Sequence, residues 1–441
     1  TLLFFVIIIS WLSFIVYNLY LSPYKHIPGP LISKIIPLYD LYFMINGTFH
    51  MHLSNLHNIY GPVVRISLDK ISINDVDSWK QIHNNYKFEK TDFYNHMRTV
   101  GWSMISIKDR KQHSSRRRTA SRAFSENNIL KLEAIVIESG VNKLVNKLKE
   151  LNGNAVDMSK EFIYLAYDVI GKLVFSKDFN LLGGSYHTIL DWIRNLMIFV
   201  VLNAVVPPVR LFGNPYYKNL AIMAKDSILQ RKQMIENGEE IPNDLLNSLI
   251  HAKDPVTDEP ISMVDLMEEC AELLLAGSDT TGHTLTWALY LILKHPEVKV
   301  KLEKEIRQVF PSTKDPLSYK KIIQDLPYFQ KVLKEILRYY PVGSHPMLRK
   351  VPHAVTLNGY FLPEDTELFT NCYAMHHSER YWDQPEKFNP DRFDDRKNND
   401  LKAFLPFSSG PRSCIGRNLA NLELSLTLVA LFLNFDILLK D

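Results

Sequence analysis

The chain begins with an uncharged apolar segment, and in the remainder of the chain hydrophobic and polar residues are interspersed. Residues 2–21 contain no charged side chain, and their number matches the roughly 20 residues that a membrane-spanning helix needs. The alternatives are a buried core helix and a secretory signal peptide, but prolines follow this segment, rather than the small residues that end a signal peptide. We therefore expect a transmembrane anchor over residues 1–22, a proline-rich hinge over residues 23–35 and one large domain over residues 36–441.

The body has mostly helical periodicity with a small amount of strand. Apolar residues recur at helical spacing over residues 327–340, and residues 417–434 form a leucine-rich helical segment. Residues 60–80 alternate weakly, and Asn358-Gly359 is a strong hairpin signal in a later extended segment. The sequence thus predicts a mainly α fold with a minor β-sheet.

Composition narrows the class of protein. The chain is 46% hydrophobic and 22% charged, as in globular proteins, and a net charge of +3 gives no reason to expect a nucleic-acid partner. Its three cysteines are too few and too far apart for a disulfide framework, which fits a reducing compartment. The chain begins with threonine and ends just after an apolar helix, so we expect both ends to be truncated.

One cysteine lies in a short loop that suits a metal-bound thiolate. Cys414 follows Phe407, Gly410 and Arg412 and precedes Gly416. Glycine permits close backbone approach, backbone N–H groups can tune a thiolate, and arginine can pair with an anionic group of a cofactor. An isolated cysteine is most often a small buried hydrophobe. Here, however, all five fixed positions of the pattern F-x-x-G-x-R-x-C-x-G match.

This loop resembles that of the cytochrome P450 family, in which the cysteine thiolate ligates haem iron. The resemblance extends over most of the chain and is to membrane-anchored enzymes of the fungal type. It implies the cytochrome P450 fold, with haem b as the cofactor and Cys414 as the iron ligand.

A helix expected from about residue 262 to 294 has an unusual centre, which reads AGSDTTG from Ala276 to Gly282. Glycines and cap-preferring residues weaken a helix. A loop between two helices is one interpretation, and a long helix opened where a threonine bonds the preceding turn is the other. The segment matches the family pattern A/G-G-x-D/E-T. The resemblance implies that Asp279 and Thr280 deliver protons to bound dioxygen.

Glu335 and Arg338 lie three residues apart beside the apolar stripe of residues 327–340. An exposed ion pair is the simpler interpretation, whereas a buried pair would need a third partner, for which Arg392 is available. The resemblance implies that these three residues form an internal structural triad, with Asp391 replacing the commoner glutamate.

Residues 108–122 form the densest run of basic side chains. Taken alone, such a run is most often a solvated helix face, and in other contexts it is a nucleic-acid patch. The resemblance implies that His113 and Arg117, four apart on one helix face, pair with a haem propionate, as do Arg349 and Arg412. The remaining cations would suit docking of an acidic electron donor, and they are Lys108, Arg110, Lys111, Arg116 and Arg118.

The other candidate ligands are weaker. We expect Cys270, on the long helix, and Cys372, in an apparent turn, to be packing residues. His376-His377 is a poor metal pair if it lies on a strand, because adjacent strand residues point to opposite faces.

The resemblance implies a monooxygenase that inserts one atom of O2 into an organic substrate by hydroxylation or epoxidation. No flavin or nicotinamide fingerprint is present, so electrons would come from an NADPH-cytochrome reductase, with cytochrome b5 as a further donor. Stretches that form the substrate pocket in relatives are rich in apolar residues here, which predicts a mainly apolar substrate; they contain Phe93, Trp102, Phe199, Val205 and Met347.

We expect an endoplasmic reticulum membrane protein of secondary metabolism, with its catalytic domain in the cytosol. Two alternatives remain: a haem-thiolate isomerase or dehydratase that needs no reductase, and a non-catalytic haem sensor or carrier. The Asp279-Thr280 pair argues against both, since neither would need proton delivery.

Overall fold

The computed structural model describes residues 2–97, 101–185, 187–205, 215–345, 347–394 and 397–440. By its internal contacts the chain divides into two compact units. The first comprises Thr1–Thr91 and Leu337–Cys414, and the second comprises Asp92–Ile336 and Ile415–Asp441. Each unit thus combines two separate stretches of sequence, and no change in composition marks the passage from one to the other.

The first unit contains short helices and all the described strands. Its strands are β1 (Val63–Arg65), β2 (Lys70–Ile73), β3 (Met347–Lys350), β4 (Val355–Leu357), β5 (Tyr360–Leu362) and β6 (Glu367–Thr370). Its helices are α1 (Leu2–Val16), the π-helix η1 (Tyr17–Leu21), η2 (Ile32–Lys34), α2 (Tyr39–Ile45), α3 (Phe49–Tyr60), α4 (Val76–His83), α17 (Cys372–His376), η6 (Pro390–Phe393), η7 (Leu401–Ala403) and η8 (Gly410–Arg412).

The strands form a four-stranded sheet of order β1-β2-β6-β3 and a separate β4-β5 hairpin. The β1-β2 pairing confirms the hairpin predicted within residues 60–80, and β6 adds to β2 in parallel. Asn358 and Gly359 join β4 to β5 with φ of 47° and 80°, the left-handed backbone that an Asn-Gly turn supplies. The sheet buries an apolar core that includes Val63, Ile71 and Leu368.

The N-terminal segment Leu2–Leu21 is helical and is the only described segment long and apolar enough to cross a membrane. This finding rests on length and composition alone. The segment ends on the sheet, because Arg65 of β1 donates to the backbone carbonyl of Asn18 at 2.9 Å and to its side-chain oxygen at 3.1 Å.

The second unit is helical. Its elements are η3 (Asp92–Met97), α5 (Arg110–Ser121), α6 (Glu126–Leu130), α7 (Glu133–Val136), the π-helix η4 (Ile137–Val141), α8 (Asn142–Glu150), α9 (Met158–Phe175), α10 (Ile189–Val205), α11 (Pro215–Glu236), α12 (Leu245–Ile250), α13 (Met263–Lys294), α14 (Pro296–Val309), α15 (Tyr319–Asp325) and α18 (Arg417–Asn434). Helix α16 (Pro327–Tyr339) contains the boundary between the units.

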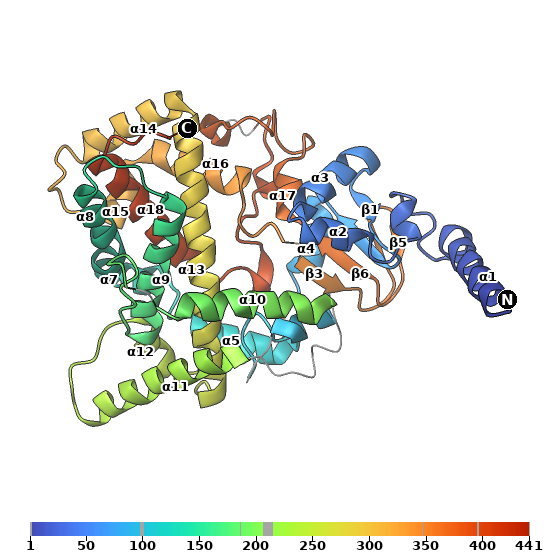
Figure 1. The fold of residues 1–441 in the computed structure, drawn as a ribbon, viewed down its shortest axis with the longest axis horizontal. Helices are drawn as coiled ribbons and strands as arrows, with labels where there is room; N and C mark the ends of the chain where they lie inside the picture. Colours follow the sequence, from blue (N-terminus) through green and yellow to red (C-terminus); the bar gives the residue numbers. More distant parts are fainter. Residues whose placement is uncertain are drawn as a thin grey trace. The chain divides into compact units, whose positions relative to one another are not determined.

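Helix α13 is the central element of the second unit, with α9 and α18 packed against it (Figure 1). It begins at Ser262, whose hydroxyl accepts from the N–H of Asp265 at 3.2 Å and caps the first turn. Helix α18 starts and ends where the leucine-rich pattern predicts, and most of its side chains are buried. The predicted fold class, mainly α with a minor sheet, is confirmed.

Candidate active site

Cys414 lies at the end of a closed loop in the first unit, directly after η8. Its backbone N–H donates to the carbonyl of Phe407 at 3.0 Å, and the N–H of Ser413 donates to the carbonyl of Gly410 at 3.1 Å. Cys414 is nevertheless exposed to solvent. The loop therefore presents a thiol on a backbone that is fixed by its own hydrogen bonds.

Gly410 is required at its position for two reasons. Its φ of 75° lies in the left-handed region, and a Cβ there would be 2.1 Å from the carbonyl oxygen of His83 at the end of α4. The loop is also bonded to α4, since the indole N–H of Trp79 donates to the hydroxyl of Ser409 at 3.0 Å. By contrast, Gly416 has an ordinary φ of −78° and precedes the first residue of α18.

The three cysteines, all of which the structure describes, differ in accessibility. Cys270 and Cys372 are buried, and burial raises the pKa of the Cys372 thiol to about 12 and that of Cys270 further still. Both therefore stay protonated and cannot reach a ligand, as expected for packing residues. Cys414 is the exposed thiol.

Two arginines of the first unit lie near the same helix end as this loop. Arg349, in β3, is 3% exposed, and its Nη1 donates to the carbonyl of Leu348 at 2.8 Å. Among the described residues, its Nε has no hydrogen-bond partner. Burial and the charge of Arg349 lower the pKa of His83 well below its usual value. The guanidinium of Arg412 lies over the ring of Tyr86, 5.2 Å from the ring centroid.

The residues of the predicted triad are all buried, with Glu335, Arg338 and Arg392 no more than 3% exposed. Arg338 and Arg392 meet at the carbonyl of Lys387, to which they donate at 3.4 Å and 2.6 Å. Arg392 also donates to the carbonyl of Asp383 at 2.6 Å. Glu335 precedes Arg338 by one turn of α16, so the exposed-pair interpretation is wrong.

His376 links this cluster to the segment before Phe407. The N–H of Leu405 donates to Nε2 of His376 at 2.9 Å, so Nδ1 carries the proton and donates to the carbonyl of Arg338 at 3.1 Å. Arg338 donates back to the carbonyl of His376 at 2.8 Å. Burial lowers the pKa of His376 well below its usual value, which keeps the imidazole neutral for these roles.

Two sequence interpretations in this region were wrong. Cys372 begins helix α17 rather than lying in a turn, because the side chain of Asn371 accepts from the N–H of Ala374 at 3.2 Å and caps a helix. His376 ends that helix, so His376-His377 does not lie on a strand. His377 bonds to backbone and carboxylate oxygens instead, and the described residues contain no cluster of metal ligands.

In the second unit, α13 is continuous through Asp279 and Thr280, which excludes the loop interpretation. The predicted bond from a threonine to the preceding turn is confirmed, because Thr280 donates to the carbonyl of Ala276 at 2.6 Å. Thr280 is exposed and Asp279 is half-buried. The hydroxyl of Tyr167 on α9 donates to Oδ1 of Asp279 at 3.0 Å. Burial raises the pKa of Asp279 above its usual value.

Helix α5 carries the basic run, and His113 is buried on it while Arg117 is half-buried one turn later. Three cations predicted to dock an electron donor are instead paired within this unit. Arg116 pairs with Asp265 at 2.6 Å and with Glu269 at 3.0 Å, and is 8% exposed. The docking role of Arg116 is therefore wrong, and Lys108 and Arg118 pair with Asp92 and Asp254. Arg110 and Lys111 are exposed.

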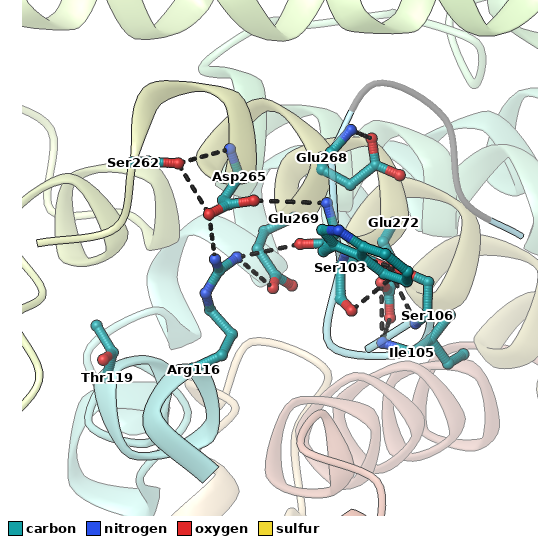
Figure 2. Close-up of polar contacts among 12 residues, drawn as sticks. Ser103, Ile105, Ser106, Arg116, Thr119, Ser262, Asp265, Glu268, Glu269 and Glu272 are labelled. Atoms are coloured by element: carbon teal, nitrogen blue, oxygen red, sulfur yellow. Dashed lines mark hydrogen bonds and ion pairs between the residues drawn. The ribbon is translucent and has the colours of Figure 1, made fainter. Parts of the chain in front are cut away.

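The partners of Arg116 belong to an acidic stretch of α13. This stretch also binds the segment from Gly101 to Ile105, which precedes α5 in the chain (Figure 2). Glu272 accepts from the N–H of Ile105 at 3.1 Å, and Glu268 accepts from that of Gly101 at 3.3 Å. Burial and the neighbouring Glu272 raise the pKa of Glu269 above its usual value, against the opposing charge of Arg116. The basic run thus neutralises acids of its own unit.

The side chains predicted to line a substrate pocket are only partly described. Phe93 is exposed, whereas Trp102, Phe199 and Met347 are half-buried. The side chain of Val205 lies outside the described residues, as do parts of the predicted pocket segments.

Comparison with known proteins decides the family. The model of the cytochrome P450 family matches residues 28–441. The chain belongs to the cytochrome P450 family. This confirms the resemblance found in the sequence, and family membership implies a haem-thiolate iron cofactor.

Named members of the family resemble the chain over nearly its full length. It is 30% identical to the cytochrome P450 monooxygenase prhB of Penicillium brasilianum, covering 97% of this chain and 90% of the relative. It is 31% identical to the cytochrome P450 monooxygenase BOA3 of Botryotinia fuckeliana, in a match that covers 96% of this chain and 87% of the relative. These relatives confirm the predicted enzyme class, a monooxygenase.

A solved structure shows the same fold. The crystal structure of the cytochrome P450DA heme domain matches with a TM-score of 0.81 at 22% identity, over 92% of this chain and 90% of that chain.

The sequence did not predict the roles of several residues at these sites. The acids Asp265, Glu268, Glu269 and Glu272 gave a usable signal, because an acidic helix start complements a basic run elsewhere in the chain. The roles of His376 and Tyr167 gave none, because they depend on contacts between elements that are distant in sequence.

Proposed function

We propose that this chain is a membrane-anchored haem-thiolate monooxygenase that inserts one atom of O2 into a mainly apolar substrate. It would act in fungal secondary metabolism, with electrons from an NADPH-dependent reductase. The Cys414 loop is the observation that carries this proposal, since it combines the full cysteine pattern with the exposed thiol of the chain.

The described residues fit a haem. Cys414 offers a thiol for iron, and Arg349 offers a buried guanidinium whose Nε is unused within the described residues, which suits a carboxylate. As the family resemblance implies, the haem propionates would pair with four basic residues, which are Arg349, Arg412, His113 and Arg117. Iron-protoporphyrin IX would supply the oxygen chemistry, in which a thiolate ligand favours O–O cleavage.

The proton chemistry belongs to α13. The Thr280 hydroxyl is exposed and anchored to its own helix, so it can hold a proton donor or water in one place. Asp279 retains a proton to higher pH than an ordinary aspartic acid, because it is half-buried. We assign proton delivery to Asp279 and Thr280. We assign a structural role, and no catalytic one, to the buried triad of Glu335, Arg338 and Arg392.

A matched pair of threonine variants tests this assignment. Thr280→Ala is expected to divert reductase-supplied electrons from product to hydrogen peroxide and to lower product formation about 10²-fold. Thr284→Ala removes the same kind of bond one turn later, where the hydroxyl donates to the carbonyl of Thr280 at 2.7 Å, and should keep coupling near that of the parent chain. Equal coupling in both variants would contradict the role of Thr280.

The anchor proposal has its own test. Residues 2–21 should hold the chain in endoplasmic reticulum membranes during an alkaline wash, with the remainder accessible to protease from the cytosolic side. A chain that is released by the wash would contradict a spanning helix.

A further inference from the structure

Helices α9 and α13 approach each other closely on either side of Asp279. A Cβ on Gly277 would lie 2.9 Å from Cδ1 of Ile170, and a Cβ on Gly282 would lie 2.7 Å from Cδ1 and 3.0 Å from Cα of Ile163. At Gly282 the backbone of Ile163 leaves no room for a side chain, whereas at Gly277 the end of the Ile170 side chain would have to move. The two glycines of this helix therefore allow α9 to pack directly against the turn that carries Asp279.

Tyr167 lies on α9 between these two contacts. It is 1% exposed, and its hydroxyl donates to Oδ1 of Asp279 at 3.0 Å. Burial and the charge of Asp279 raise the pKa of Tyr167 far above its usual value, so the phenol remains a hydrogen-bond donor. A buried hydroxyl without this partner would be costly, which makes the contact specific.

We propose that Tyr167 is a positioning residue for Asp279. Its hydroxyl holds one carboxyl oxygen towards α9 and leaves the other oxygen for proton transfer beside Thr280. Gly277 and Gly282 set the helix spacing that this contact requires. The proposal rests on the proposed function for the role of Asp279, but the contact itself can be tested without turnover.

The groups around Asp279 determine whether its pKa rises or falls when the Tyr167 hydroxyl is removed. Among the described residues, the groups that act on its charge are Tyr167, opposite on α9, and His283, one turn later on α13. Burial raises the pKa of Asp279, whereas the hydrogen bond from Tyr167 and the charge of His283 lower it. Loss of the Tyr167 hydroxyl should therefore raise this pKa further.

Infrared spectroscopy of the full chain can measure this titration directly. The carboxyl stretching band of protonated Asp279 is identified by its loss in Asp279→Asn and is followed against pH. In Tyr167→Phe we expect the midpoint to rise by about one pH unit, a tenfold fall in the acid dissociation constant. Gly282→Ala, which forces α9 away, should shift the midpoint in the same direction.

A second replacement keeps the test informative if Tyr167→Phe folds poorly. With 3-fluorotyrosine at position 167, the phenol is a stronger donor of nearly the same size, so the midpoint should fall instead of rise. Tyr381→Phe serves as the control, because it removes another buried phenol, in the first unit, whose oxygen accepts from the N–H of Val76 at 3.2 Å. It should leave the Asp279 midpoint unchanged.

The outcomes separate the two proposals. A midpoint that does not rise in Tyr167→Phe, or does not fall with fluorotyrosine, overturns the positioning role. If the midpoints shift as expected, the pH profile of reductase-dependent NADPH oxidation should shift with them. A parent chain that binds no thiolate-ligated haem would refute the proposed function, and the infrared titration would still report on Tyr167.

Discussion

Single residues determine how the Cys414 thiol is presented. Gly410 combines a left-handed backbone with direct contact to α4, so two separate requirements exclude any side chain there. Arg349 shows the complementary case, in which a buried guanidinium keeps an N–H unused among the described residues. The close backbone packing at Gly410 and the unused N–H of Arg349 are both what we expect of a loop that holds a bound group.

Two glycines of like conformation provide a residue-scale prediction. Gly359 has φ of 80°, and nothing lies within 4 Å of the position that a Cβ would take, so Gly359→Ala should cost only about 1–2 kcal/mol for the left-handed backbone. Gly410→Ala has the same backbone cost and adds about 1–3 kcal/mol because its Cβ would overlap the carbonyl of His83. Urea unfolding measures both. Equal losses of stability would contradict the close packing of the loop.

At the scale of elements, two parts of α13 have different roles, its acidic first turns and its glycine-containing centre. Its first turns are acidic and bind α5 and the segment from Gly101 to Ile105 (Figure 2). Its centre contains the glycines that admit α9 and the residues that we assign to proton delivery. The acidic turns hold a loop in place, and we propose that the central turns deliver protons.

An arginine variant on α5 and one on α10 test the role of the acidic turns. Arg116→Met should cost about 3–5 kcal/mol, because it leaves the buried carboxyl group of Glu269 and the partly buried one of Asp265 without their cation. Arg194→Met breaks an ion pair with Asp191 in which the arginine side chain is 70% exposed, and should cost about 1 kcal/mol or less. Thermal or urea unfolding compares them, and a cost for Arg116→Met no greater than that for Arg194→Met would contradict a buried network.

The elements that could be predicted are those whose signals are local. Ser262 caps α13, Asn358-Gly359 forms the hairpin, and the leucine-rich segment becomes α18 over the expected residues. Each depends on a turn residue or a periodicity that can be read within one segment. The same holds for the Cys414 loop, whose pattern is contained in ten residues.

The predictions that failed concern what side chains meet across the fold. Arg116 looked like a surface cation because its acidic partners lie about 150 positions later in the chain. Cys372 looked like a turn residue because Asn371 before it is favoured in turns as well as at helix N-caps, and here it caps α17. Tyr167 had no sequence signal at all, since its only distinction is a hydrogen bond to a distant helix.

At the scale of the whole molecule, the chain builds two units from alternating stretches. The first unit contains the cysteine loop, the sheet and the cluster around Arg338, and the second contains α13 with its helical neighbours. The family assignment covers both, because the matching residues run from 28 to 441. The central claim is thus that the whole chain is a haem-thiolate enzyme with Cys414 as its ligand.

The most direct test is the absorption spectrum of the purified, haem-loaded chain after reduction under carbon monoxide. The account predicts the long-wavelength Soret band of a thiolate-ligated haem in the parent chain and in Cys372→Ser, and loss of that band in Cys414→Ser. A histidine-type Soret band in the parent chain, or an unchanged thiolate band in Cys414→Ser, would contradict it.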